Sequence, residues 1–135
     1  MKTFALAYLS TAMVMLGLDA IWLSLSAGPL YRAQLGSLLL PKFQPLPAAL
    51  FYLLYVLGLV VLVVMPAVSA RGWEYALVRG ALFGCVAYAT YDLTNQATLR
   101  GWSTVVTLAD LAWGTTLSAV AATVAYLVVK AVLIR

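Results

Sequence analysis

Long apolar stretches, each interrupted by only a few polar residues, fill most of the 135-residue chain. About 20 consecutive apolar residues are enough for an α-helix to cross the hydrocarbon core of a bilayer. Glycine, proline and basic residues separate the stretches. The pattern therefore predicts an all-α protein with four transmembrane helices. The predicted spans cover approximately residues 4–25, 48–68, 75–98 and 103–133.

The segment between the first and second predicted spans has a different pattern. Residues 30–44 mix leucines with polar and charged side chains, and are too short and too polar to cross a bilayer. We expect Gly28 and Pro29 to end the first helix, because glycine and proline interrupt helices. A short interfacial helix should follow, lying against the membrane surface. The whole chain, residues 1–135, is then expected to form a single integral membrane domain, a four-helix bundle.

The basic residues give an expectation for orientation. Four spans place both termini on the same side of the membrane, and five basic residues would lie on that side against three on the other. Because basic residues accumulate on the cytoplasmic side, both termini are expected in the cytoplasm. The five are Lys2, Arg71, Arg79, Lys130 and Arg135, and the three are Arg32, Lys42 and Arg100.

Composition excludes several kinds of chemistry. Hydrophobic residues make up 65% of the chain and charged residues only 9%, with no histidine and a single cysteine. A histidine-ligated haem, a Cys/His zinc site and a Cys–His nucleophile pair are therefore excluded. The net charge of +4 is spread over loops and termini, so no basic run indicates nucleic-acid binding. We expect no metal and no cofactor, and the lipid bilayer as the main partner.

Three of the four acidic residues lie inside predicted spans: Asp19, Asp92 and Asp110. An ionised carboxylate facing lipid near the middle of a span costs roughly 2.5–3.5 kcal/mol. These aspartates should therefore face the protein interior. Given the predicted helix boundaries and directions, and a rise of about 1.5 Å per residue, all three lie roughly 10 Å below the same membrane face.

Aromatic and polar neighbours accompany the aspartates at helical spacing. Asp-x-x-Trp occurs twice, at residues 19–22 and 110–113, on helices expected to be antiparallel. Either an inverted repeat or chance would explain why the pattern occurs twice. Two nearby arginines, Arg32 and Arg100, would either cap the acidic layer or lie among lipid headgroups. The candidate ligand- or ion-binding residues are Asp19, Trp22, Tyr88, Tyr91, Asp92, Asn95, Asp110 and Trp113.

The run from Tyr88 to Trp102, followed by Asp110-Leu-Ala-Trp-Gly114, is distinctive. Together with Leu18-Asp-Ala-Ile-Trp-Leu23, it resembles the DUF2177 family of small bacterial multi-pass inner-membrane proteins. The most specific part is Tyr-Asp-Leu-Thr-Asn at residues 91–95. The resemblance covers nearly the whole chain and implies a bacterial inner-membrane location. It implies no activity.

Three functions fit these observations. The acidic layer could bind or transport a proton, a cation or a small amphiphilic ligand, with aromatic walls attracting a cation. It could instead support acid–base catalysis on a lipid. The aspartates could also tie the helices together in a structural or accessory subunit. The first function, without enzymatic activity, is favoured. A chain this small would need a homo-oligomer to enclose a transport path.

Overall fold

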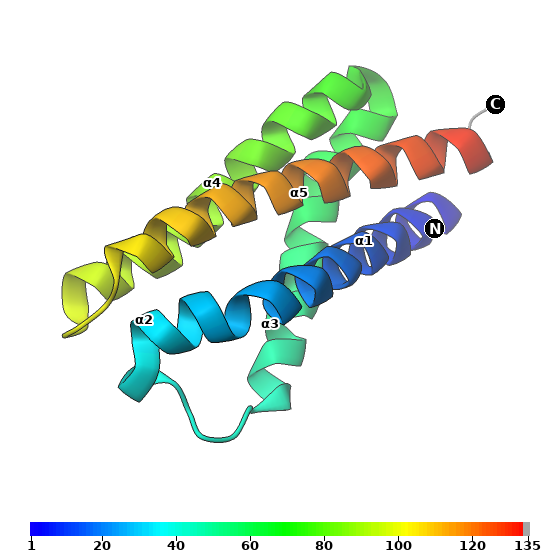
Figure 1. Ribbon diagram of the computed structural model, residues 1–135. Coiled ribbons are helices and arrows are strands. Elements are labelled where there is room, and N and C mark those ends of the chain that lie inside the picture. The colour runs from blue at the N-terminus through cyan, green and yellow to red at the C-terminus, as the bar shows by residue number, and fades with distance from the viewer. Residues whose placement is uncertain (134–135) are drawn as a thin grey trace.

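The computed structural model describes residues 1–133 (Figure 1). Helix accounts for 91% of the structure, and residues 1–133 contain no strand, which confirms the all-α prediction. Within these residues, three helical runs are long and apolar enough to cross a membrane. They are Lys2–Leu38, Pro45–Thr98 and Thr104–Leu133.

Each of the first two runs is assembled from shorter helical elements. The first joins α1 (Lys2–Ser26), the π-helical η1 (Ala27–Arg32), α2 (Ala33–Leu35) and the 3-10 turn η2 (Gly36–Leu38). The second joins α3 (Pro45–Leu59), the π-helical η3 (Val60–Val64) and η4 (Ala67–Arg71), and α4 (Gly72–Thr98). The third run is α5 (Thr104–Leu133).

The prediction that Gly28 and Pro29 end the first helix is wrong. The helix continues through both residues to Leu38, so no separate interfacial helix forms between the first two runs. Proline cannot donate the usual backbone hydrogen bond of an α-helix and clashes with the preceding turn. The wider π-helical turn of η1 contains Pro29, and such turns accommodate an interruption of the regular hydrogen-bond ladder.

The segment between the second and third predicted spans is helical up to a turn at Gly72. The helical run continues through residues 69–74, and Glu74 lies in the first turn of α4. The run nevertheless turns sharply before α4, as the green ribbon shows (Figure 1). Gly72 has φ 85° and ψ 178° there, a conformation that only glycine adopts without strain. The second and third predicted spans therefore meet at this turn, within the second of the three long helical runs.

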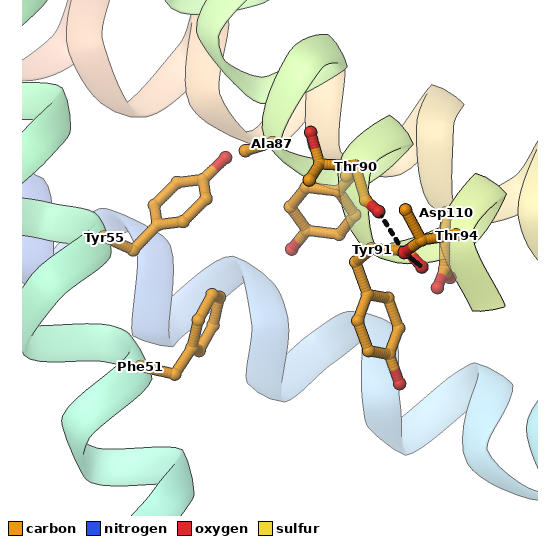
Figure 2. A pocket seen from close by; sticks show the side chains of 8 residues that line it. Phe51, Tyr55, Ala87, Thr90, Tyr91, Thr94 and Asp110 are labelled. Carbon is orange, nitrogen blue, oxygen red and sulfur yellow. Dashed lines mark hydrogen bonds between the residues drawn. The ribbon is translucent and has the colours of Figure 1, made fainter.

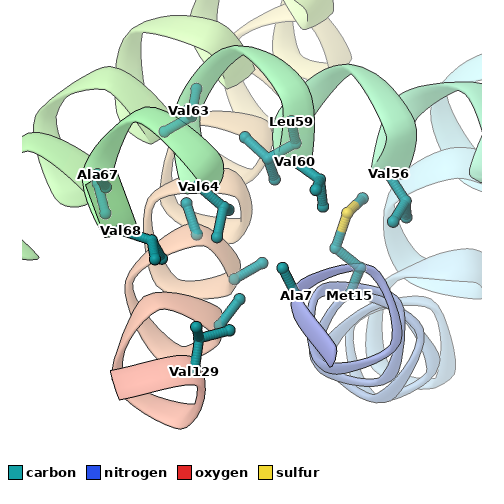
Figure 3. Packing of buried hydrophobic residues seen from close by; sticks show 14 of the residues in the cluster. Ala7, Met15, Val56, Leu59, Val60, Val63, Val64, Ala67, Val68 and Val129 are labelled. Carbon is teal, nitrogen blue, oxygen red and sulfur yellow. The ribbon is translucent and has the colours of Figure 1, made fainter. Parts of the chain in front are cut away.

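A buried stripe on the second run forms the apolar core (Figure 3). Its members recur in neighbouring pairs every four residues, a longer period than the 3.6 residues of an α-helix. The π-helical turns of η3 and η4 widen the local period and keep the stripe on one side. It packs against Ala7 and Met15 of α1 and Val129 of α5. The stripe consists of Tyr55, Val56, Leu59, Val60, Val63, Val64, Ala67 and Val68.

Glycine allows α4 and α5 to pack with their backbones in close contact, side by side (Figure 1). A Cβ atom added at Gly84 would lie 2.0 Å from the carbonyl oxygen of Gly114, and one at Gly80 would lie 2.7 Å from that of Ser118. A Cβ at Gly114 would lie 2.2 Å from the ring of Tyr88. This close packing places the inward side chains of α4 directly against α5.

Candidate functional site

Asp19 of α1 is a point of contact between three helices. Its Oδ2 accepts a hydrogen bond from the Tyr52 hydroxyl of α3 (2.7 Å), and its Oδ1 accepts one from the Trp113 indole N–H of α5 (2.8 Å). The residue is only 7% exposed. Each carboxylate oxygen thus has a donor from a different helix, and hydrogen bonds to a charged acceptor are stronger than neutral ones. We call Asp19, Tyr52 and Trp113 the Asp19 node.

The two Asp-x-x-Trp segments meet in space. The indole rings of Trp22 and Trp113 stack with centroids 4.6 Å apart and planes 8° from parallel. Trp113 donates to Asp19, which belongs to the other segment. Trp22 donates to the Tyr31 hydroxyl (2.9 Å), and Tyr31 in turn donates to Asp110. Each tryptophan therefore supports the aspartate of the opposite segment, one directly and the other through a tyrosine.

Asp92 of α4 has a very different environment. It is fully buried, and neither of its carboxyl oxygens accepts a hydrogen bond from any residue of the described chain. Its carboxyl group lies close to that of Asp110. Two ionised carboxylates would repel each other there, whereas one shared proton would give Asp92 a hydrogen-bond partner. We call these two residues the Asp92–Asp110 pair.

An aromatic groove of about 620 Å³ opens between α3 and α4 beside this pair. Phe51 and Tyr55 project from α3 toward the α4 side of the groove, and Asp110 lies at its other end (Figure 2). The rings of Tyr55 and Tyr88 meet edge to face, with centroids 6.1 Å apart. The lining residues are Phe51, Tyr55, Ala87, Tyr88, Thr90, Tyr91, Thr94 and Asp110.

The remaining predicted site residues are more peripheral. Tyr91 is 58% exposed and lines the groove, with its ring 5.8 Å from that of Trp102. Asn95 is half-buried. Arg32 and Arg100 are both exposed, and neither is among the hydrogen-bond partners of the aspartates in the described chain. The structure thus brings the three aspartates and both tryptophans together, and leaves the two arginines outside.

Sequence reasoning missed two essential donors, Tyr31 and Tyr52. Tyr31 was assigned to an interfacial helix, and it reaches Asp110 only because the first helical run continues through Pro29 as a π-helical turn. Tyr52 lies three residues before Tyr55, whose hydroxyl bonds to Ser118 (2.7 Å). This i, i+3 pair of tyrosines on an otherwise apolar helix was the available signal, because buried hydroxyls need partners.

The chemistry available at this site is limited to carboxyl, phenol, hydroxyl and indole groups. Among residues 1–133, no group of three or more acidic or cysteine side chains could hold a metal ion. The Asp19 node has its hydrogen bonds satisfied, whereas the Asp92–Asp110 pair is an acidic centre beside an aromatic groove. Such a centre can exchange a proton or hold a positive charge.

These features define a helical membrane protein with a polar network inside its apolar helices. The chain belongs to the DUF2177 family, described as predicted membrane proteins, whose family model matches residues 4–127. The resemblance expected from the sequence is therefore confirmed, and with it the membrane location. The comparisons with curated proteins and with solved structures found no match.

Proposed function

We propose that the protein binds a small lipophilic cation in the aromatic groove, with the Asp92–Asp110 pair holding the positive charge. One observation carries the proposal: Asp92 is fully buried with no donor to its carboxyl oxygens. A buried acid without a partner is costly in a membrane protein and typically marks a functional site. Asp19, at a similar burial, has both oxygens satisfied and fits a structural role.

The groove suits the apolar part of such a ligand. Its volume of about 620 Å³ falls within the range of roughly 300–1,000 Å³ that is typical of small-molecule sites. Phe51, Tyr55, Tyr88 and Tyr91 supply aromatic rings, whose faces attract cations. Asp110 at the end of the groove would meet the charged part of the ligand. The arrangement therefore favours a cationic amphiphile over an anionic or strongly polar solute.

The charge of the pair favours a monovalent ligand. Two carboxyl groups that share one proton carry a single negative charge, which one monovalent cation neutralises. Uptake of a second proton would remove that charge and weaken binding, so affinity is expected to fall as the pH falls. The same competition would couple cation movement to proton movement in a transporter. Because a chain of this size can hardly enclose a path, transport would require a homo-oligomer.

Binding of tetraphenylphosphonium to purified protein, followed by isothermal titration calorimetry, tests the proposal. Asp110→Asn should weaken binding by about tenfold or more, because it removes a charged contact. Glu74→Gln is the matched control, since Glu74 is an exposed acid at the start of α4 and outside the groove. Equal affinity in wild type and Asp110→Asn, with both proteins folded, would refute a binding role for the pair.

We further propose that the bent second run crosses the membrane twice, giving four spans with both termini in the cytoplasm of a bacterial cell. Glycine at residue 72 supports a reversal between η4 and α4. A Cys85→Ser background carrying Glu74→Cys or Arg100→Cys tests this with a membrane-impermeant maleimide. Residue 100 should react in intact cells and residue 74 only after lysis. The reverse pattern would overturn the orientation.

A second candidate function is acid–base catalysis on a lipid. The observation that favours it is the closeness of the Asp92 and Asp110 carboxyl groups, because one protonated and one ionised acid can act as general acid and base. Mass spectrometry of lipid extracts tests this function. It compares a deletion strain with the same strain complemented by wild type or by Asp92→Asn. Unchanged lipid profiles across growth conditions would exclude this function.

A further inference from the structure

A second groove lies between the two arms of the bent run, and no aspartate lines it. It has a volume of about 340 Å³ and runs between η3 and α4. Leu62 and Val63 line it from η3, and Leu82 and Phe83 line it from α4. Tyr75 and Arg79 also line it, closer to the start of α4. The groove is therefore apolar along its length and carries a guanidinium group.

Two arginines gather around one aromatic ring at this basic end. The guanidinium carbon of Arg71 lies 5.0 Å from the ring centroid of Tyr75, and that of Arg79 lies 5.6 Å from it. Both distances are within the range of a cation–π contact. Both arginines are exposed, and both guanidinium groups contact the same tyrosine ring. Two neighbouring guanidinium groups favour an anion with several oxygen acceptors, such as a phosphate.

The same end of the molecule carries further positive charge. The N-terminal end of α1, the C-terminal end of α5 and the turn into α4 lie together at one end (Figure 1). Lys2 is exposed at the start of α1, and the Lys130 ammonium lies 5.9 Å from the Tyr126 ring centroid near the end of α5. A phosphate bound at Arg71 and Arg79 would therefore meet a positive surface, which anionic lipid headgroups prefer.

The length of the groove matches one lipid chain. Along α4 it extends from Tyr75 to Ala87, a length of twelve residue steps, or about 18 Å at about 1.5 Å per residue. One leaflet supplies about half of a hydrocarbon core that is roughly 30 Å thick. A headgroup at the level of Tyr75, which Arg71 and Arg79 both contact, would thus allow an acyl chain to follow the groove to about the middle of the bilayer.

We propose that this second groove is a binding site for an anionic phospholipid, with the phosphate held by Arg71 and Arg79 and one acyl chain lying between η3 and α4. The site is independent of the acidic pair, because the two grooves share only Ala87 and carry charges of opposite sign. The lipid would lie in the leaflet on the side where α1 begins and α5 ends (Figure 1).

Native mass spectrometry of protein released from mixed vesicles of phosphatidylglycerol and phosphatidylcholine tests this proposal. Wild type should retain phosphatidylglycerol in preference to phosphatidylcholine. Arg79→Gln should reduce that retention by about tenfold, because it removes a charged hydrogen-bond donor. Arg100→Gln is the matched control: this exposed arginine does not line the groove and should leave retention unchanged.

A second variant separates the groove from simple surface charge. Leu62→Trp would fill the apolar part of the groove without changing any charge, and residue 62 is 61% exposed, so folding should tolerate the larger side chain. This variant should also lose retention of phosphatidylglycerol. No preference for phosphatidylglycerol in wild type would overturn the proposal. The proposal would also be overturned if Arg79→Gln lost retention of phosphatidylglycerol while Leu62→Trp kept it.

Discussion

The Asp19 node and the Asp92–Asp110 pair place the same acidic side chain in two opposite environments. Asp19 accepts one hydrogen bond on each carboxylate oxygen, from Tyr52 and Trp113. Asp92 is more deeply buried and has no donor. Burial alone therefore does not identify a functional acid in a membrane protein. The supply of donors from neighbouring helices separates an acid that holds the fold together from one that is available to a ligand.

The largest expected effect comes from separating the helices that hold the pair. Gly84→Ala would bring a Cβ atom to 2.0 Å from the Gly114 carbonyl oxygen, so α4 must move away from α5. We expect a loss of about 3 kcal/mol or more in the free energy of unfolding, together with loss of tetraphenylphosphonium binding. Thermal unfolding in detergent measures the first effect. Gly17→Ala is the control, because nothing lies within 4 Å of its added Cβ, and it should leave the stability unchanged or slightly higher.

Asp19→Asn should produce the next largest effect on stability. The amide replaces one carboxylate oxygen with a donor, which would face the hydroxyl of Tyr52 or the indole N–H of Trp113. We expect a loss of about 2 kcal/mol. Asp92→Asn should cost less than about 1 kcal/mol, because no donor is lost and the amide can bond to Asp110. Equal destabilisation by the two variants would contradict the division between a structural and a functional acid.

Two tyrosine variants sharpen the comparison with a smaller effect. Tyr52→Phe removes a donor from Asp19 and should lower the free energy of unfolding by about 1–2 kcal/mol. Tyr31→Phe removes the hydrogen-bond donor to Asp110. The Asp110 carboxyl group is then stabilised less by the protein and more by a bound cation, so tetraphenylphosphonium should bind more tightly. Thermal unfolding of Tyr52→Phe and calorimetric titration of Tyr31→Phe check these two expectations. Weaker binding by Tyr31→Phe would indicate that Tyr31 positions the pair instead of competing with the ligand.

The all-α fold and the meeting of the aspartates were predictable from sequence, because the cost of exposing a carboxylate to lipid forces it inward. The path of the chain between helices was not. Pro29 was expected to end a helix, yet a π-helical turn carries the chain past it and brings Tyr31 to Asp110. Hydropathy likewise predicted a turn at residues 69–74 but could not show that the chain stays helical up to Gly72.

The difference between Asp19 and Asp92 was also beyond the sequence. Both occur in apolar helices with aromatic neighbours, and the sequence makes both of them candidate binding residues. Which donor reaches which oxygen depends on packing between helices that are far apart in sequence: Trp113 lies 94 residues from Asp19. For Asp92 and Asp110 it depends on the close packing of α4 against α5 that the glycines allow.

Infrared spectroscopy of the purified protein without ligand tests the central claim most directly, since it detects the carbonyl stretch of a protonated carboxylic acid. A proton shared within the Asp92–Asp110 pair predicts this band in wild type at neutral pH. The band should persist in Asp19→Asn and disappear in Asp92→Asn, where Asp110 would keep its hydrogen bond from Tyr31 and have no carboxyl partner with which to share a proton. Absence of the band in wild type, or its loss in Asp19→Asn with retention in Asp92→Asn, would contradict the account.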